Sequence, residues 1–479
     1  MVGGVRMQIG LSHKNLSRLL MVLALMFYIA NTFPLLGKMP VTMDEVLFAE
    51  PARNFVQEGH FGTTSMSGLF QFQTKTYWQH PLYIMLMYIP IKSFGFNCWS
   101  IKILSAFLGL LSLLLAYKIG KNLGVPHLFP ILLVFNVLFI WVACIGRMEM
   151  LTLLLSLASF YFAWNKRPVE AGFIGSLAVL NHPVGFFTVL DGLILLKLKA
   201  SVDKRFFAAL AFPVLITFSF VIGDLNEFVR QYFTVQRYLY ANSGWLGGPL
   251  VQLKNFLRLL QEARQWLFWL IPLALMMIVG LTKKQDNEAK TLLLIQAVNF
   301  LGLVVLVPNK YINYYVALVI PYMALYAAYS LKKHRSTGLV FLLIVLIFTN
   351  GIGIVKSFSG YRNGNDGAAT LQNLVEPHST VIAQPSLAVY LDDCRVIGFH
   401  NVRMIMDLER KTAETALQEI SPDYIVIDTN IAQFNKWPLF TEDQDSLGKF
   451  IKKKTVFCGK TQIHGKNYYV FKFTRDGQV

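Results

Sequence analysis

Long apolar runs separated by short polar segments fill residues 18–356 of the 479-residue chain. A run of about 20 apolar residues is long enough to cross the hydrocarbon core of a membrane as a helix. We place the spans at residues 18–37, 99–119, 127–145, 150–164, 170–181, 184–197, 206–223, 265–281, 291–307, 314–331 and 338–356. The pattern predicts a polytopic α-helical membrane protein with about eleven transmembrane helices, in which residues 1–357 form the membrane domain.

Residues 80–96 are apolar enough to be mistaken for a further span. The run is short and contains Pro90 and Lys92, and counting it as a span would turn the basic loops that follow outward. We interpret it as a helix that lies in the plane of the interface. Residues 38–98 then form one large outer loop with interfacial helices, and residues 224–264 form a second outer loop.

The composition changes after residue 357. The segment S-F-S-G-Y-R-N-G-N-D-G indicates a linker, and residues 362–479 then combine strand-like runs such as Y-I-V-I-D-T with a helical run, K-T-A-E-T-A-L-Q-E-I. Strands interleaved with helices predict a small C-terminal α/β domain of about 115 residues. If the N-terminus is cytoplasmic, an odd number of spans makes this domain extracytoplasmic.

The basic residues indicate the orientation of the chain and the class of its partners. The net charge is +17, yet only 15% of the residues are charged, against about 25% in an average soluble domain. The Lys and Arg clusters fall in alternate loops, at Arg6, Lys14 and Arg18; Lys118 and Lys121; Lys166 and Arg167; Lys197, Lys199, Lys204 and Arg205; Lys283, Lys284 and Lys290; and Lys332, Lys333 and Arg335. The positive-inside rule assigns these loops to the cytoplasm, which favours a membrane over nucleic acid as the partner.

The sequence of the predicted outer segments also indicates which cellular membrane the protein occupies. They contain no N-x-S/T sequon, which favours a bacterial plasma membrane over the endoplasmic reticulum. Cys394 and Cys458 both fall on the outer side, where they either form a disulfide or remain free thiols.

Two adjacent acids follow the first span in the segment P-V-T-M-D-E-V-L-F-A-E. Thr42-x-x-Glu45 has the form of a capping box, in which Glu45 binds the backbone at the start of a helix, and Gly59 is placed to end that helix. Asp44 is not explained by the cap. An acid so near a membrane surface more often has a partner or a task.

Further polar side chains interrupt the apolar sequence at the same outer face. They are Arg147 and Glu149 in G-R-M-E-M, His182 in N-H-P, His80 in W-Q-H-P-L-Y, Lys310 and Tyr314 in P-N-K-Y-I-N-Y-Y, Arg53 after the acidic pair, and Arg230 and Arg237 on one face of an amphipathic helix. Each also has a structural interpretation as a loop residue, a turn or an interfacial anchor. Together they combine carboxylates, which accept a proton from a hydroxyl, with basic groups, which stabilise a departing phosphate.

The order of these motifs resembles the GT-C superfamily of membrane glycosyltransferases, and within it the family of bacterial aminoarabinose transferases and protein O-mannosyltransferases. M-D-E-V-L-F-A-E-P-A-R-N-F is similar to the family's D-E-x-x-Y-A-x-x-A segment, and W-Q-H-P-L-Y is similar to its K/H-P-P-L motif. N-H-P-V-G-F resembles T-K-G-P, Y-Y-V-A-L-V-I-P resembles Y-L-L-P-L-x-P, and R-M-E-M corresponds to the second acidic site. The resemblance covers most of residues 18–330.

The resemblance implies a role for each matching residue. Asp44 would be the catalytic base, Glu45 its neighbour in the active site, and Glu149 the second acid. The substrate-binding residues expected on this basis and from the shared outer face are Arg53, His80, Arg147, His182, Arg230, Arg237, Lys310 and Tyr314. A divalent cation, Mg²⁺ or Mn²⁺, would find oxygen ligands in Asp44 and Glu149.

We therefore expect an inverting glycosyltransferase that moves a sugar from a polyprenyl-phosphate donor to a lipid, glycan or protein hydroxyl at the outer membrane face. The alternative is a transporter or flippase of a lipid-linked sugar. A helix broken at residues 181–183 would suit such a transporter.

Overall fold

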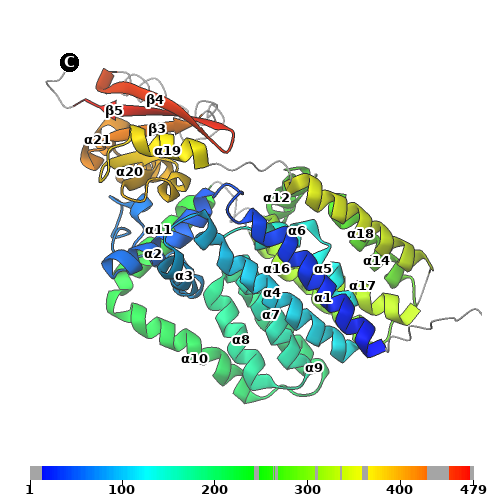
Figure 1. Cartoon of the computed structure of the whole chain (residues 1–479). Coiled ribbons are helices and arrows are strands. Elements are labelled where there is room, and N and C mark those ends of the chain that lie inside the picture. Colours follow the sequence, from blue (N-terminus) through cyan, green and yellow to red (C-terminus); the bar gives the residue numbers. More distant parts are fainter. Residues whose placement is uncertain are drawn as a thin grey trace, which may run out of the picture.

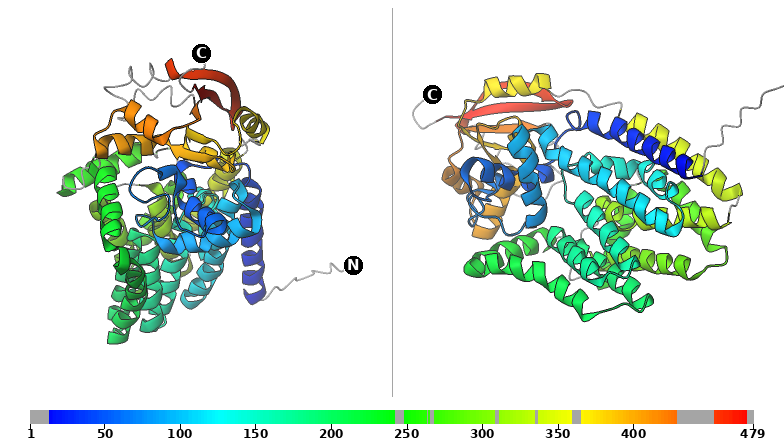
Figure 2. Two further views of the ribbon diagram at one scale, coloured as in Figure 1. Left: turned by 90° about the vertical axis from the view of Figure 1, so that its left-hand side faces the viewer. Right: turned by 60° about the horizontal axis from the view of Figure 1, so that its bottom comes forward.

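The computed structural model describes residues 13–241, 248–262, 264, 268–307, 311–334, 337–358, 365–428 and 453–474. These residues form a bundle of helices with a small mixed sheet at one end (Figure 1). Two further views show that the first helix begins at the end of the bundle that lies away from the sheet (Figure 2).

The segment that we predict as the first outer loop folds into two helices that pack against each other, α2 and α3. The elements of this region are α1 (His13–Thr32), η1 (Phe33–Leu35), α2 (Met43–Glu58), η2 (Thr64–Met66), α3 (Pro81–Phe94) and α4 (Cys98–Leu123). Helix α3 matches the run for which we expect an interfacial helix. It has 14 residues and is therefore about 21 Å long, shorter than the hydrocarbon core of a typical bilayer.

The central helices are short and closely packed, and two of them replace one expected span. Their bounds are α5 (Leu128–Val134), α6 (Val137–Ala143), α7 (Glu149–Trp164), α8 (Pro168–Asn181), η3 (Pro183–Gly185), α9 (Phe186–Leu198), α10 (Lys204–Val221) and η4 (Ile222–Asp224). The expectation of one helix over 127–145 is wrong, because the buried Asn136 side chain accepts from the N–H groups of Leu138 and Phe139 and starts a new helix.

The remaining membrane-domain helices surround this centre. They are α11 (Leu225–Ala241), α12 (Gly248–Glu262), η6 (Phe268–Leu270), α14 (Ile271–Leu281), α15 (Asn287–Leu306), α16 (Ile312–Leu318), α17 (Ile320–His334) and α18 (Thr337–Phe358). Helices α16 and α17 are bent by 45° at a break after Leu318.

The expected number of about eleven spans is not confirmed. Among the described residues, five helices are long and apolar enough to cross a membrane, or six if the bent pair α16 and α17 counts as one. Several predicted spans fold instead as helices of 7 to 16 residues, including α5, α6 and α7. Such interrupted helices are tolerated at membrane depth where neighbouring helices bury them.

The loops that the basic clusters assign to one side do meet at one end of the bundle. Lys332 donates to the carbonyl of Leu123, and the Lys199 ammonium lies 3.9 Å from the centre of the Trp164 ring. Loops assigned to the other side contact one another as well. Lys75, for example, pairs with Asp224 at 2.7 Å between the two outer loops.

The C-terminal domain is a five-stranded mixed sheet in the order β2-β1-β3-β5-β4. Its elements are α19 (Asn365–Leu374), β1 (Thr380–Ala383), η7 (Pro385–Val389), β2 (Arg395–Gly398), α20 (Phe399–Glu409), α21 (Ala413–Ile420), β3 (Tyr424–Asp428), β4 (Thr455–Ile463) and β5 (Lys466–Phe473). Strands β1, β2 and β3 are parallel, and β4 and β5 form an antiparallel hairpin that joins β3. Cys394 and Cys458 are free thiols.

The C-terminal domain packs on the first outer loop through a shared hydrophobic cluster. Leu47 of α2 and Phe72 of the loop pack together with Val402 and Ile405 of α20. Figure 1 shows α20 lying over α2 at this end of the bundle. The helix that begins with the acidic pair is therefore held between the membrane domain and the C-terminal domain.

Candidate active site

The start of α2 is fixed by its own side chains and by α4. The Oε2 atom of Glu45 accepts from the Thr42 N–H at 2.7 Å, and the Thr42 hydroxyl accepts from the Glu45 N–H at 3.4 Å. This is the predicted capping box, and Gly59 ends the helix in the left-handed region as expected. Lys102 of α4, fully buried, donates to the carbonyls of Met39 and Pro40 and holds the turn before the helix.

Glu45 also reaches across to the short loop between α6 and α7. Its Oε1 atom accepts from the backbone N–H of Gly146 at 2.7 Å. Both carboxylate oxygens of Glu45 are thus bound to backbone, and the side chain is only 1% exposed. Glu45 therefore joins the segment that begins α2 to the loop before α7, and this contact brings the G-R-M-E-M segment next to α2.

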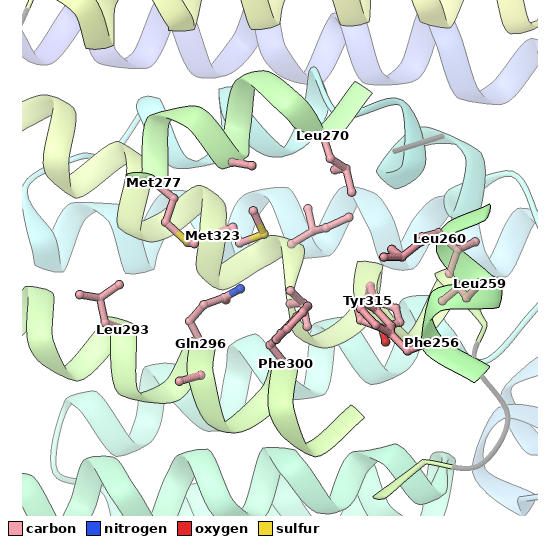
Figure 3. A pocket seen from close by; sticks show the side chains of 15 residues that line it. Phe256, Leu259, Leu260, Leu270, Met277, Leu293, Gln296, Phe300, Tyr315 and Met323 are labelled. Atoms are coloured by element: carbon pink, nitrogen blue, oxygen red, sulfur yellow. The ribbon is translucent and has the colours of Figure 1, made fainter. Parts of the chain in front are cut away.

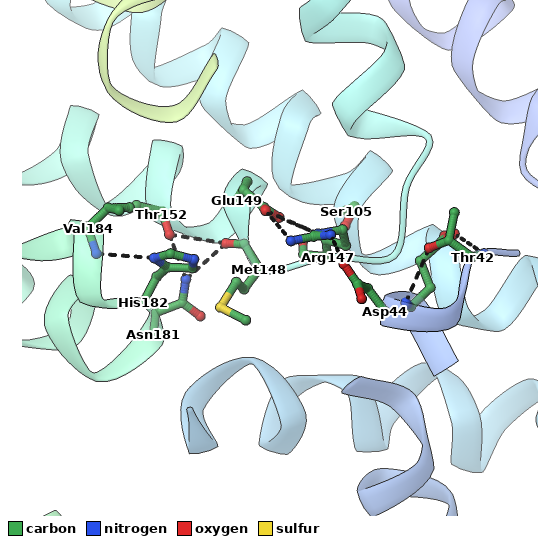
Figure 4. A network of polar contacts seen from close by, with 11 residues as sticks. Thr42, Asp44, Ser105, Arg147, Met148, Glu149, Thr152, Asn181, His182 and Val184 are labelled. Carbon is green, nitrogen blue, oxygen red and sulfur yellow. Dashed lines mark hydrogen bonds and ion pairs between the residues drawn. The ribbon is translucent and has the colours of Figure 1, made fainter. Parts of the chain in front are cut away.

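The Arg147 guanidinium lies between Asp44 and Glu149 (Figure 4). It contacts Oδ2 of Asp44, and its Nε lies 3.1 and 3.3 Å from the two oxygens of Glu149. Ser105 of α4 donates to the Arg147 carbonyl at 3.1 Å, which fixes the backbone of the loop. Two acids that are far apart in sequence are thus joined by one cation.

The three charged side chains differ in their exposure to solvent. The Glu149 side chain is fully buried and that of Arg147 is 11% exposed, but that of Asp44 is 36% exposed. Two carboxylates and one guanidinium leave an excess of one negative charge. Asp44 is the member of the group that an incoming molecule can reach.

The position of Arg147 bears on the expected metal ion. A guanidinium already neutralises the charge between Asp44 and Glu149, and both carboxylates point at it. Among the described residues, no group of three or more His, Cys, Asp or Glu side chains has the arrangement of a metal site. The two acids do not fit a shared Mg²⁺ or Mn²⁺ site in this arrangement, and we derive no step through a metal.

A row of rings continues the site away from Asp44. The His80 and His182 rings are stacked with centroids 6.2 Å apart, and the Tyr314 ring meets His182 edge-on at 4.8 Å. Burial lowers the pKa of His80 to about 4, so this imidazole is neutral at physiological pH. The His182 Nδ1 accepts from the Val184 N–H at 3.1 Å, which leaves Nε2 as the nitrogen to face a ligand.

The break between α8 and α9 positions His182. Asn181 donates to the carbonyl of Met148 at 2.9 Å and to the Thr152 hydroxyl at 2.9 Å, and so ties the break to the start of α7 (Figure 4). The N-H-P segment is therefore held next to the loop that carries Arg147 and Glu149.

The structure brings together Asp44, Glu45, Arg147, Glu149, His80, His182 and Tyr314. Arg53 lies instead at the other end of α2, where it pairs with Asp392 of the C-terminal domain. Arg230 stacks over the Phe70 ring at 4.6 Å, within the contact between the two outer loops. Lys310 and the side chain of Arg237 lie outside the described residues.

Tyr311 belongs to the site although we did not select it from the sequence. The Arg147 guanidinium carbon lies 5.7 Å from the centre of the Tyr311 ring, and Tyr311 contacts the Tyr314 ring edge-on at 5.5 Å. The signal was present, because Tyr311 stands in the same P-N-K-Y-I-N-Y-Y segment. Spacing alone did not show which of its tyrosines turns toward Arg147.

An apolar pocket of about 380 Å³ lies within the helix bundle (Figure 3). It is lined by Phe256, Leu259, Leu260, Leu270, Ala274, Met277, Leu293, Gln296, Ala297, Phe300, Ile312, Tyr315, Val319, Ile320 and Met323. Helix α16 connects it to the site, because Ile312 and Tyr315 line the pocket while Tyr314 contacts His182.

Comparison with known proteins finds likeness in structure and not in sequence. No family model matches the chain, and no curated protein matches it. ArnT from Cupriavidus metallidurans bound to undecaprenyl phosphate is similar with a TM-score of 0.65 and 12% identity, over 96% of this chain and 98% of that one. The apo state of the same protein gives a TM-score of 0.58 at 11% identity, over 95% and 98%.

A second kind of solved structure is also similar. The oligosaccharyltransferase AglB from Archaeoglobus fulgidus, in complex with an inhibitory peptide and a dolichol-phosphate, has a TM-score of 0.54 at 12% identity. The match covers 97% of this chain and 75% of that one. Likeness at this identity concerns the fold, and it extends over both the helix bundle and the C-terminal domain. The chain therefore has the fold of the GT-C membrane glycosyltransferases.

Proposed function

We propose that the protein is an inverting glycosyltransferase that moves a sugar from a polyprenyl-phosphate donor to an acceptor hydroxyl at the outer face of a bacterial plasma membrane. The observation that carries the proposal is the partly exposed Asp44 carboxylate, which is held by Arg147 against the buried Glu149. The fold it shares with ArnT and AglB supports the same reaction class.

In this reaction Asp44 takes the proton of the acceptor hydroxyl as the oxygen attacks the anomeric carbon of the sugar. The bond from that carbon to the phosphate oxygen breaks, and the electron pair leaves with the polyprenyl phosphate. A single displacement inverts the anomeric centre. Arg147, fixed by Glu149, holds the Asp44 carboxylate in place for the proton transfer.

The protein has groups beside Asp44 that suit both parts of the donor, the phosphate and the isoprenoid tail. The departing phosphate would lie near the Arg147 guanidinium and the His182 Nε2 nitrogen, which can stabilise its growing negative charge. The first isoprene units next to the phosphate would lie in the apolar pocket that α16 joins to the site. The similar ArnT structure is bound to undecaprenyl phosphate, which supports this class of lipid.

The alternative of a transporter depends on polar groups deep in the bundle. Asp191 of α9 is the clearest such group, and it is buried. The Asn299 side-chain nitrogen lies 3.1 and 3.0 Å from its two oxygens, so this acid joins α9 to α15. A structural role therefore accounts for the buried Asp191. The arrangement of charged groups around Asp44 favours sugar transfer over transport.

Asp44→Asn tests the proposal, because the amide keeps the shape of the carboxylate and cannot accept the proton. Membranes from a strain that lacks the chain would be supplied with purified variant and a polyprenyl-phosphate sugar fraction. Mass spectrometry would then follow the glycoconjugate that the strain fails to make. We expect a rate loss of about 10²–10⁴-fold.

Asp224→Asn is the matched control, since Asp224 is an outer-loop acid that pairs with Lys75 away from Arg147. It should retain the wild-type rate. A correctly folded Asp44→Asn protein that transfers sugar at the wild-type rate would refute the mechanism. Movement of the intact donor across proteoliposomes without sugar transfer would favour the transporter.

A further inference from the structure

The first observation concerns a histidine that the C-terminal domain places beside α2. His400 stands in the first turn of α20, and neither of its ring nitrogens has a hydrogen-bond partner although both are buried. Buried polar atoms are nearly always paired, so such a ring needs an explanation. Burial lowers the pKa of His400 to about 4, and the Asp44 carboxylate acts on the ring in the opposite sense.

The backbone makes room for this ring. A Cβ atom at Gly398 would lie 2.4 Å from Cε1 and 2.6 Å from Nδ1 of His400, so only glycine fits while the ring keeps its place. On α2, Met43 and Leu47 flank Asp44 and pack in the same hydrophobic cluster as Phe399, the neighbour of His400. His400 is thus fixed at the seam between the two domains, on the Asp44 side.

The second observation is a polar cavity of about 560 Å³ at the same seam, toward the far end of α2. It is lined by Arg53, Asn54, Gln57, Glu58, His60, Thr64, Ser67, Gln73, Thr74, His378, Asp392, Asp393, Cys394 and Arg395. Every lining side chain is polar or, in Cys394, a thiol. Asp44 and Asn54 lie on one helix and are separated by a rise of about 15 Å.

Two of the acids in the cavity have a basic partner there. Arg53 pairs with Asp392 at 2.8 Å, and His60 lies 2.6 Å from Glu58. Amide and hydroxyl groups such as Asn54, Gln57 and Thr74 supply the rest of the lining with donors and acceptors. Such a surface suits a hydroxyl-rich ligand better than an ion or an apolar chain.

We propose that the seam between α2 and the C-terminal domain binds the acceptor, a carbohydrate, with His400 contacting the acceptor group next to Asp44 and the cavity holding the sugar residues behind it. The inference rests on the proposed function and adds the acceptor class and its site. His400 is a binding residue here, because the proton of the acceptor hydroxyl goes to Asp44.

The test separates acceptor binding from donor binding. Membranes of the strain that lacks the chain serve as the acceptor source and are titrated against a fixed amount of donor. His400→Ala and Gln57→Ala should each raise the half-saturating amount of membrane about five- to tenfold, the effect of one or two lost hydrogen bonds. Gly398→Ala, which displaces the ring without removing it, should act in the same direction.

Binding of undecaprenyl phosphate should stay at the wild-type value. The thermal unfolding midpoint shows that each variant is folded at the assay temperature, and it should fall in His400→Ala and Gly398→Ala because both disturb a buried ring. His464→Asn, in the turn between β4 and β5, and Gln418→Ala, on the exposed face of α21, are the matched controls and should leave the titration unchanged. A titration that is unchanged in both His400→Ala and Gln57→Ala, while Asp44→Asn abolishes transfer, overturns this inference alone. Full transfer by Asp44→Asn overturns the proposed function instead.

Discussion

The two ends of helix α2 each carry an arginine–aspartate pair, and the pairs differ in what surrounds them. At the first end, Arg147 bridges the partly exposed Asp44 and the buried Glu149, so one negative charge is left over. At the other end, the buried Arg53 pairs with Asp392 alone, and the charges balance. The same two residue types therefore give an accessible carboxylate in one place and a clamp between domains in the other.

The surroundings explain the difference. The Arg147 loop comes from the membrane domain and is fixed by Glu45 and Ser105. The Asp44 carboxylate is not needed to hold this loop, so part of it remains accessible to solvent. Arg53 stacks on the Phe96 ring at 5.1 Å and reaches a residue 339 positions later in the chain. The excess negative charge at the partly exposed Asp44 is suited to catalysis. The balanced pair of Arg53 and Asp392 is suited to holding the two domains together.

The largest effect should come from removing each arginine in turn. Arg147→Met leaves Asp44 and the buried Glu149 as uncompensated charges, and we expect a loss of about 3–5 kcal/mol in the free energy of unfolding together with loss of transfer. Arg53→Met should cost only about 1–2 kcal/mol, because Asp392 is 43% exposed and water can replace the guanidinium. It should weaken transfer only through the acceptor cavity that Arg53 lines, so transfer at saturating acceptor should be retained.

Unfolding in detergent micelles and the transfer assay measure both variants side by side. Equal losses of stability would show that the two pairs are equivalent and would remove the basis of the comparison. Loss of transfer in Arg53→Met at saturating acceptor, as complete as in Arg147→Met, would contradict the view that Arg53 acts only on stability and acceptor binding.

A smaller effect is expected from the middle of α2, where Glu50 lies between the two pairs. Glu50 is fully buried, its Oε2 accepts from the Ser65 N–H at 3.1 Å, and its Oε1 has no partner. Burial raises its pKa from 4.5 to about 7. The folded state thus binds the proton more tightly than the unfolded state, and stability falls as the pH rises from about 4.5 to about 7.

The size of this pH effect follows from the shift in pKa. It amounts to about 3 kcal/mol, lost across that range and constant above it. Glu50→Gln should remove this dependence on pH, and Glu58→Gln, an exposed acid on the same helix, should leave it intact. Thermal unfolding midpoints measured across and just above this pH range give the slope of stability against pH. A slope that persists in Glu50→Gln would contradict the buried-carboxyl explanation.

Local sequence was sufficient for part of this site. The capping box of Thr42 and Glu45 and the stop at Gly59 follow from rules that span a single helix. The prediction that both residues lie at the same face of the membrane was enough to group Asp44 with Glu149. The apolar pattern also located most helices, but it could not reveal the break at Asn136, because two short buried helices have the same periodicity as one long one.

Contacts that join distant segments were out of reach of the sequence. Nothing near Arg147 indicates that its side chain turns between two acids, and nothing near Arg53 points to Asp392. The same limit applies to His400, whose position depends on how the C-terminal domain packs on α2. These residues are placed by tertiary packing, which a one-dimensional pattern does not encode.

The smallest effect should come from the cap that precedes Asp44, and it separates the two neighbouring acids. Thr42→Ala removes the hydroxyl that accepts from the Glu45 N–H, and we expect a loss of about 1 kcal/mol in stability. Transfer should remain near the wild-type rate, because Glu45 still accepts from Gly146 and Arg147 still holds Asp44. Thr42→Ser keeps the hydroxyl and should match the wild type in both measurements. If Thr42→Ala instead reduced transfer as strongly as Asp44→Asn does, the cap would control the position of the carboxylate, and the division between a structural Glu45 and a catalytic Asp44 would fail.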